Sequence, residues 1–212
     1  MQYDPSFVSH RPILTAYDQQ GLQRLSNIYP LQRFTSDHRN DEETVVDFVY
    51  TSAKIEGNTY DRLDTDNLLR FGVTAGGKRY SDAVMLVNLR AGFERVIAME
   101  SDTVVDLDYV CDLHKILMRD LLPVNVQGAA RSSEVQIMGT NYSPLTSASQ
   151  LRTEMRFILQ EARRYANPFE RAIYLHCNLA YLKYFRGGNQ QMARFIQTAA
   201  LVRAGLLPLL LK

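Results

Sequence analysis

Cysteine is scarce in this chain, since its 212 residues include only Cys111 and Cys177. Two isolated cysteines cannot build a disulfide framework or a structural zinc site, and this scarcity favours a reducing compartment. We therefore expect a cytoplasmic protein. His114 and His176 have no further ligands at metal spacing, so the sequence predicts no metal site around them and assigns both to helix packing.

An excess of charge of one sign is also lacking, because the formal net charge is only +1. No basic field is available to attract nucleic acid, and no pattern of a DNA-recognition helix is present, which argues against a DNA-binding regulator for this segment. Long apolar runs are missing as well. The most apolar stretch, Leu206–Leu211, is far shorter than the roughly 20 residues that span a bilayer. Met1–Arg11 is polar and contains Pro5, so no secretory signal and no membrane partner are expected.

Helical periodicity is the dominant pattern of the chain. Residues 1–40 show little of it and are interpreted as an N-terminal arm with one short helix near Asp18–Ile28. Residues 41–212 are predicted to form one all-α domain. Apolar spacing and helix-ending residues predict helices at about 44–57, 59–69 (starting at Thr65 or Asp66), 81–100, 104–122, 149–165, 169–184 and 190–204.

The one segment with β character lies between the helices predicted at 104–122 and 149–165. Two short extended runs, Glu134–Met138 and Asn141–Tyr142, are separated by Gly139 and followed by Pro144. This pattern predicts a small β-hairpin.

The turn Lys183–Asn189 is the most informative segment for function. It runs KYFRGGN and leads directly into a predicted helix that carries Arg194. Unsatisfied N–H groups at a helix start attract anions, glycines let an anion approach closely, and an arginine one turn later could reach a phosphate. On its own this is a pattern of low specificity, because most Gly-Gly-Asn turns only connect helices.

The sequence around this turn resembles the signature of the Fic (Fido-fold) family, His-Pro-Phe-x-Asp/Glu-Gly-Asn-Gly-Arg-x-x-Arg. In the segment KYFRGGNQQMAR, Phe185, Gly188, Asn189 and Arg194 stand where that signature requires them. By the same correspondence Gln191 stands at the first arginine of the signature. The resemblance thus implies nucleotide contacts at Gly188, Asn189, Gln191 and Arg194.

Two further segments resemble the same family in the expected order. The segment 135–144 is similar to the family's flap hairpin, which holds a target segment by strand addition. Its flap positions are Ile137, Gly139, Tyr142 and Pro144. Thr51–Asn58 is similar to the family's inhibitory-helix pattern, in which Ser52 and Glu56 are the inhibitory residues, and this helix is placed at about 44–57.

The resemblance implies an all-α Fic/Fido helical bundle with a small β-hairpin flap. It also implies an enzyme that transfers AMP from ATP to hydroxyl groups of a protein target bound at the flap, with Mg²⁺ on the nucleotide phosphates. Assembly into a homo-oligomer is compatible with it.

Three positions depart from the family's chemistry. Lys183 replaces the histidine that acts as general base, and an ordinary lysine is protonated at neutral pH. Gly187 replaces the magnesium-binding acid, which weakens any Mg²⁺ site, and Gln191 replaces the first arginine. One interpretation is a protein with little or no transferase activity. The alternative is an active nucleotidyl or phosphoryl transferase with altered chemistry, in which Glu56 inhibits the chain itself. Lys183 would then act either as a phosphate clamp or as a base with a lowered pKa, with His176 as a possible assistant.

The resemblance also pairs Glu56 with Arg194, for which Glu56 would compete with the γ-phosphate of ATP. Two interpretations of this pair stay open. It is either a regulatory contact or a structural ion pair that ties the N-terminal helix to the rest of the domain.

Overall fold

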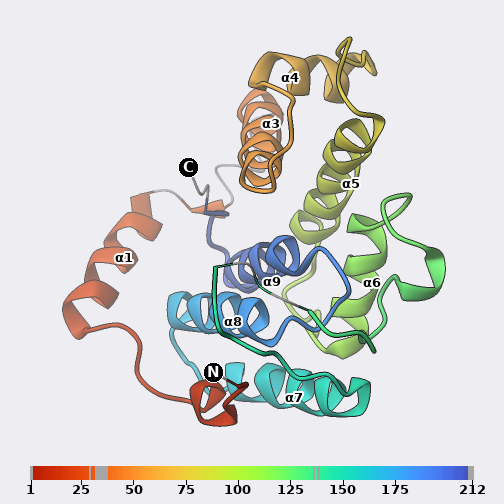
Figure 1. Ribbon diagram of the computed structural model, residues 1–212. Helices are drawn as coiled ribbons and strands as arrows, with labels where there is room; N and C mark the ends of the chain where they lie inside the picture. Colours follow the sequence, from red (N-terminus) through yellow and green to blue (C-terminus); the bar gives the residue numbers. More distant parts are fainter. Residues whose placement is uncertain (1, 29, 32–37, 136, 138, 210–212) are drawn as a thin grey trace.

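The computed structural model describes residues 2–28, 30–31, 38–135, 137 and 139–209 (Figure 1). In chain order these residues form η1 (Pro5–Val8), α1 (Ala16–Ile28), α3 (His38–Ile55), α4 (Arg62–Phe71), α5 (Tyr80–Ile97), α6 (Leu107–Leu117), η2 (Val124–Val126), α7 (Ala148–Ala162), α8 (Pro168–Leu182) and α9 (Asn189–Arg203).

Helix α9 is the centre of the domain. Every residue from Gln191 to Val202 is buried, so this helix is covered on all sides rather than along one stripe. It packs most extensively against α8 and also contacts α5 and α6. Figure 1 shows α7 and α8 on one side of α9, with α3, α4 and α5 on the other. The start of α9 therefore lies where helices from both halves of the chain converge.

The long periodic segments are helices, as predicted, and their ends follow local capping. Helix α6 begins after Asp106, whose carboxylate accepts a hydrogen bond from Tyr109 N–H at 2.9 Å, and it ends at Leu117. The predicted helix over 104–122 is therefore too long, and Asp120, with φ of 59°, lies outside helical geometry. No described helix is both long and apolar enough to cross a membrane.

The predicted start of α4 at Thr65 or Asp66 is wrong. Asp61 caps this helix instead, because its carboxylate accepts a hydrogen bond from Asp64 N–H at 2.8 Å. Thr65 already lies in the first turn, and its hydroxyl donates to the carbonyl of Asp61 at 2.7 Å. The side chain of the residue just before this short helix thus fixes its start.

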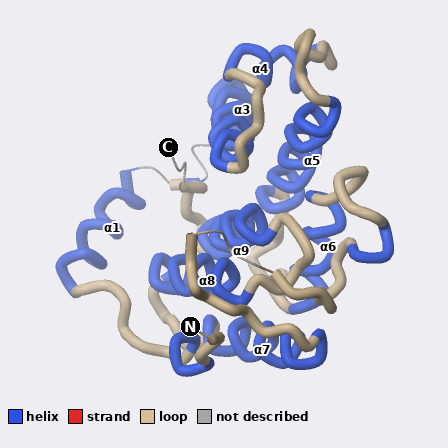
Figure 2. The backbone as a smooth tube through the Cα atoms, viewed as in Figure 1, coloured by secondary structure: helices blue, strands red, loops and turns tan. Residues whose placement is uncertain are grey.

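The predicted β-hairpin is not confirmed. Figure 2 draws no strand, and none of the described residues between 133 and 147 belongs to one. Gln136 and Met138 of the predicted first strand lie outside the described residues. The segment bonds elsewhere: the Tyr142 hydroxyl donates to the carbonyl of Tyr181 at 2.8 Å, and the carbonyl of Ser143 accepts from Tyr3 N–H at 3.1 Å. Contacts with the arm and α8 thus take the place of pairing between two strands.

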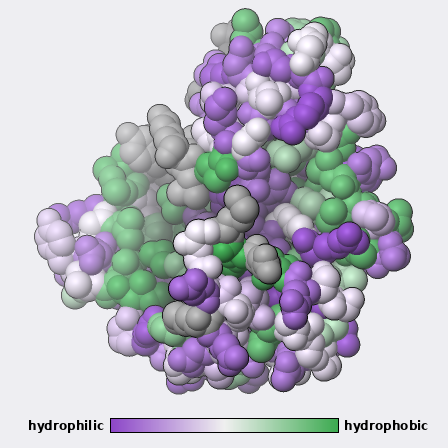
Figure 3. Space-filling view, viewed as in Figure 1, coloured by the Kyte–Doolittle hydropathy of each residue, from purple (hydrophilic) through white to green (hydrophobic). Residues whose placement is uncertain are grey.

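The N-terminal arm is fastened to α7 and α8 by side chains that bond its backbone. The Glu161 carboxylate accepts from His10 N–H at 3.0 Å, and the Glu170 carboxylate accepts from the N–H groups of Ile13 and Leu14 at 2.8 and 3.0 Å. The helix that follows in the arm, α1, buries none of its residues. Apolar surface gathers in the region of α1 and its neighbours in Figure 3.

Candidate functional site

The loop between α8 and α9 is closed by its own side chains. Helix α8 ends at Leu182 and is followed by its C-cap Lys183, which takes the left-handed conformation with φ of 51°. Helix α9 begins after Gly188, with φ of 68°. The Asn189 side chain bridges the loop, since its oxygen accepts from Phe185 N–H at 2.9 Å and its amide donates to the Phe185 carbonyl at 2.8 Å. Gly188 offers no side-chain cap, so the first N–H groups of α9 receive none.

Gly188 is required by its surroundings as well as by its backbone. A Cβ atom at this position would lie 2.5 Å from Cε and 2.8 Å from Sδ of Met118. At Gly187 the φ is ordinary, and a Cβ atom would meet only the methyl groups of Leu122, at 3.4 and 3.7 Å. The loop therefore excludes a side chain at 188 but leaves room for one at 187.

His114 contacts the loop between α8 and α9 as a neutral imidazole ring. Its Nδ1 accepts a hydrogen bond from Gly128 N–H at 2.8 Å, so the proton lies on Nε2, which donates to the carbonyl of Gly187 at 3.1 Å. The ring also stacks on Phe185, with centroids 3.8 Å apart and planes 7° apart. Burial lowers the pKa of His114 to about 4, against a smaller opposing effect of the Gly187 carbonyl. The packing role predicted for His114 is therefore joined by a positioning role that sequence reasoning missed.

Glu56 and Arg194 meet beside the start of α9. Arg194 Nη2 donates to Glu56 Oε1 at 2.6 Å and to the backbone carbonyl of Ser52 at 3.2 Å. The two side chains differ in burial, because Arg194 is 7% exposed and Glu56 is 23% exposed. Ser52 is buried and contributes through its backbone.

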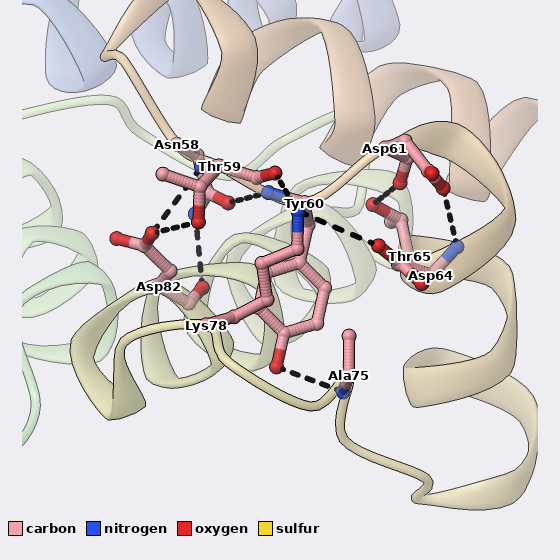
Figure 4. A network of polar contacts seen from close by, with 9 residues as sticks. All are labelled: Asn58, Thr59, Tyr60, Asp61, Asp64, Thr65, Ala75, Lys78 and Asp82. Carbon is pink, nitrogen blue, oxygen red and sulfur yellow. Dashed lines mark hydrogen bonds and ion pairs between the residues drawn. The ribbon is translucent and has the colours of Figure 1, made fainter.

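The position of Glu56 is fixed by the turn that follows α3, drawn in Figure 4. Asn58 donates its side-chain amide to the carbonyl of Asp82 at 2.9 Å, and the Thr59 hydroxyl donates to the Asp82 carboxylate at 2.6 Å. Burial raises the pKa of Asp82, but hydrogen bonds from Thr59 and then Arg79 outweigh it and lower the pKa overall. A charged Asp82 on α5 thus anchors the end of the helix that presents Glu56.

Cations outnumber acids around the loop. Arg131, which is buried, donates from Nε to the carbonyl of Lys183 at 2.6 Å, and its N–H donates to the carbonyl of Tyr184 at 3.0 Å. Burial lowers the pKa of Lys183, while the charge of Glu56 opposes that change. Glu56 is thus the acid that faces both Arg194 and Lys183.

Several buried polar atoms near the loop lack a hydrogen-bond partner among the described residues. They include Nη2 of Arg131, Oε1 of Gln191, Nε of Arg194 and Nδ1 of His176. The pKa of His176 is lowered, first by burial and then by the charge of Arg194. Buried polar groups are nearly always paired in folded proteins, so this concentration indicates a site that a polar ligand would complete.

The residues predicted for the nucleotide site therefore come together. Gly188 and Asn189 form the start of α9, Gln191 and Arg194 lie in its first turns, and Lys183 ends α8. No described group of three or more His, Cys, Asp or Glu side chains could hold a metal ion.

The flap positions lie together in a loop of irregular structure. Ile137, Gly139, Tyr142 and Pro144 all line one cavity of about 590 Å³, the flap cavity, whose other lining residues are Glu134, Val135, Thr140, Asn141, Ser143 and Thr146. The N-terminal arm covers one side of this segment, where Tyr3, Tyr181 and Tyr142 stack successively at centroid distances of 5.0 and 4.7 Å. The sequence contained no signal for this contact, because it joins residues about 140 positions apart.

Comparison with known proteins agrees with this geometry. A sequence model of the Fic/DOC family matches residues 104–201, which contain α6 to α9 and the loops between them. This chain carries a Fic-family domain. The Fic domain is similar to "Protein adenylyltransferase fic-1" of Caenorhabditis elegans, at 25% identity over 94% of this chain and 41% of that protein. It is also similar to "Protein adenylyltransferase Fic" of Aedes aegypti, at 23% identity over 94% of this chain and 42% of that protein.

Solved structures show the same fold. The Fic-1 structure from C. elegans matches with a TM-score of 0.76 at 20% identity, over 92% of this chain and 60% of that one. A Fic-family structure from Desulfovibrio desulfuricans matches with a TM-score of 0.75 at 18% identity, over 91% and 60% of the two chains. This Fic chain spans less than half the length of the curated relatives named above.

Proposed function

We propose that the loop between α8 and α9 binds the phosphates of ATP, that Glu56 controls access to it, and that adenylate transfer is weak or absent. The observation that carries this proposal is the pair between Glu56 and the buried Arg194, with nitrogen and oxygen 2.6 Å apart. A phosphate that replaced the Glu56 carboxylate would meet a guanidinium that is already in place. The uncapped start of α9 would supply N–H donors to the same anion.

The residues around the loop suit an anion in other respects. The free Nε of Arg194 and the free Nη2 of Arg131 are donors that await an acceptor. The Gln191 oxygen is an acceptor and would oppose a phosphate. However, the two ends of an amide are interchangeable by a flip, which would present its NH₂ group as a further donor. We thus expect ATP to fit the existing donors with only local adjustment.

The loop lacks several of the groups that adenylate transfer requires. A general base must be unprotonated, a divalent ion needs oxygen ligands, and developing phosphate charge needs compensating cations. Lys183, Gly187 and Gln191 each fail one of these requirements. The described residues around the loop do not fit a magnesium ion, since Gly187 has no side-chain oxygen and no acidic cluster replaces it. We therefore expect any Mg²⁺ to be held by the nucleotide rather than by this chain.

One observation favours the alternative of an active transferase with altered chemistry. Burial lowers the pKa of Lys183, which brings its amine closer to the neutral form that a base requires. In that case Lys183 would accept the proton of a target hydroxyl, and Glu56 would inhibit the chain itself. The transfer assay below separates the two interpretations.

The proposal is tested first by calorimetric titration of ATP with Mg²⁺ into the wild-type protein and into Glu56→Gly. We expect at least tenfold tighter binding in the variant, and loss of binding when Arg194→Ala is added. The control is Glu94→Gln, which removes a surface acid that pairs with Arg90 at 2.8 Å. Equal affinity in all proteins, or no binding in any, would contradict the role proposed for the loop.

Transfer itself is measured with labelled ATP and self-modification as the readout. We expect little incorporation with Glu56→Gly alone. Incorporation should rise strongly when Lys183→His, Gly187→Asp and Gln191→Arg are added, because position 187 has room for a side chain. Strong transfer by Glu56→Gly that Lys183→Met abolishes would instead establish the alternative.

The target of any transfer would be a protein segment at the flap cavity, which is lined by Ile137, Gly139, Tyr142 and Pro144 among others. A cytoplasmic location is part of the proposal, and it is based on the scarcity of cysteine in the sequence. Assembly into a homo-oligomer remains a proposal that sedimentation would test.

A further inference from the structure

A second pocket lies at the opposite end of helices α8 and α9. Its volume is about 360 Å³, within the range of ligand sites. The loop between α8 and α9 lies at the start of α9, and this pocket lies at the end of α9. The 15 residues of the helix therefore separate the two sites by about 20 Å. The lining residues are Val104, Val105, Leu159, Ala162, Arg163, Arg171, Leu175, Ala200 and Arg203.

The lining combines apolar walls with cations. Six of its nine residues are apolar and the other three are arginines, with no acidic residue among them. Within the described part of the chain, Arg163, Arg171 and Arg203 take part in no ion pair. Asp106 and Asp108 line a neighbouring hollow that shares Leu159 and Arg163 with this pocket.

Arg171 is only partly satisfied. Its Nη2 donates to the carbonyl of Tyr165 at 2.7 Å, while its Nε is buried without a partner among the described residues. Burial, and next the charge of Arg203, lower the pKa of Arg171, and both arginines line the same pocket. Arg203 is fixed as well, because its Nε donates to the carbonyl of Ser101 at 3.0 Å. Arginines that line a pocket without an ion-pair partner among the described residues make a site suited to an acceptor with negative charge.

We propose that this pocket binds a small amphipathic organic anion, a carboxylate attached to an apolar chain or ring. The carboxylate would lie beside the guanidinium groups of Arg171 and Arg203, since planar guanidinium groups match carboxylate oxygens. The apolar part would lie on Leu159, Leu175 and Ala200. Inorganic phosphate would leave those walls exposed to water, and a neutral alcohol would leave the arginines uncompensated.

The test uses octanoate as the probe, titrated into the complete chain and followed by calorimetry. Octanol and inorganic phosphate serve as the ligand controls. We expect saturable binding of octanoate, at least tenfold weaker binding of both controls, and a rise in the thermal midpoint of the protein with octanoate. Octanol binding as tightly as octanoate would overturn the proposal, because the arginines would then contribute nothing.

Two variants remove the site by different routes. Arg171→Gln should weaken octanoate at least tenfold, and Ala200→Met should weaken it similarly by filling the pocket while all three arginines remain. The matched control is Arg164→Gln, an arginine one residue from Arg163 that pairs with Glu161 outside the lining. Because Arg171 also donates to the Tyr165 carbonyl, circular dichroism establishes that each variant is folded.

The assignment would be refuted if Ala200→Met left the octanoate affinity unchanged, or if Arg164→Gln lowered it as much as Arg171→Gln does. Neither outcome depends on ATP binding at the distant loop.

Discussion

His114 predicts a specific loss of stability in mild acid. The ring is fully buried, and both nitrogens are engaged in a way that only the neutral form satisfies. A second proton on Nδ1 would remove the acceptor for Gly128 N–H and place a charge in a dry site. The domain should therefore become less stable as the pH falls through the range in which an unfolded histidine takes up a proton.

The magnitude follows from the two pKa values. The folded pKa of His114 is about 4 and the ordinary value is 6.5. Because the folded pKa is the lower one, the unfolded state binds more protons between these values, and the stability is lost as the pH falls. The linkage relation gives a loss of about 2 kcal/mol between pH 7 and pH 5, rising to about 3 kcal/mol at pH 4.

Urea unfolding at pH 5, 6, 7 and 8 measures this effect, in the wild-type protein and in His114→Gln. The glutamine amide can still donate to the Gly187 carbonyl but does not titrate. We expect the variant to be destabilised by about 1–2 kcal/mol at pH 8, from the lost ring packing, with a distinctly flatter pH dependence. If His114→Gln and the wild-type protein lost the same free energy between pH 7 and pH 5, the neutral clamp would be refuted.

Three further substitutions test the site by its stability. In a urea titration, Glu56→Gln should lower the free energy of unfolding by about 1–3 kcal/mol, because it leaves Arg194 buried without its acid. The surface control Glu94→Gln should lower it by less than about 0.5 kcal/mol. Lys183→Met should stabilise the domain at pH 7, since burial disfavours the charged amine. That gain should shrink as the pH approaches 10.5, and a gain independent of pH would exclude this cause. Gly188→Ala should lower the free energy of unfolding, measured by thermal unfolding, by about 1–2 kcal/mol. Alanine is strained at the positive φ of this position, and its Cβ would clash with Met118. An unchanged stability would mean that the loop relaxes freely.

Much of the fold could be predicted from the sequence because it depends on local pattern. The predicted helices over 169–184 and 190–204 correspond to α8 (Pro168–Leu182) and α9 (Asn189–Arg203). Helix ends were harder to predict, since a cap is one side chain among several candidates: Asp61, rather than Thr65 or Asp66, begins α4. The hairpin prediction had the weakest basis, because two short extended runs become strands only if they pair with each other.

The candidate site likewise has a part that could be predicted from local sequence and a part that could not. Motif positions at fixed spacing were predictable, because Gly188, Asn189 and Arg194 lie on one loop and one helix. The contacts that position them were not, since Arg131 reaches the carbonyl of Lys183 from 52 residues away and His114 reaches Gly187 from 73. Such contacts depend on how helices pack, which hydrophobic periodicity does not specify.

The unequal burial of Glu56 and Arg194 favours the regulatory interpretation of their contact. Most of the free-energy cost of removing Arg194 from water has already been incurred in the folded protein, since its side chain is only 7% exposed. Glu56, at 23% exposed, can move towards solvent at a smaller cost. An incoming phosphate would therefore exchange one anion for another at a fixed cation, with no need to open the core. A purely structural pair would be expected to bury both partners, and the anchoring of Glu56 through Asn58 and Thr59 places the acid at the edge where exchange is possible.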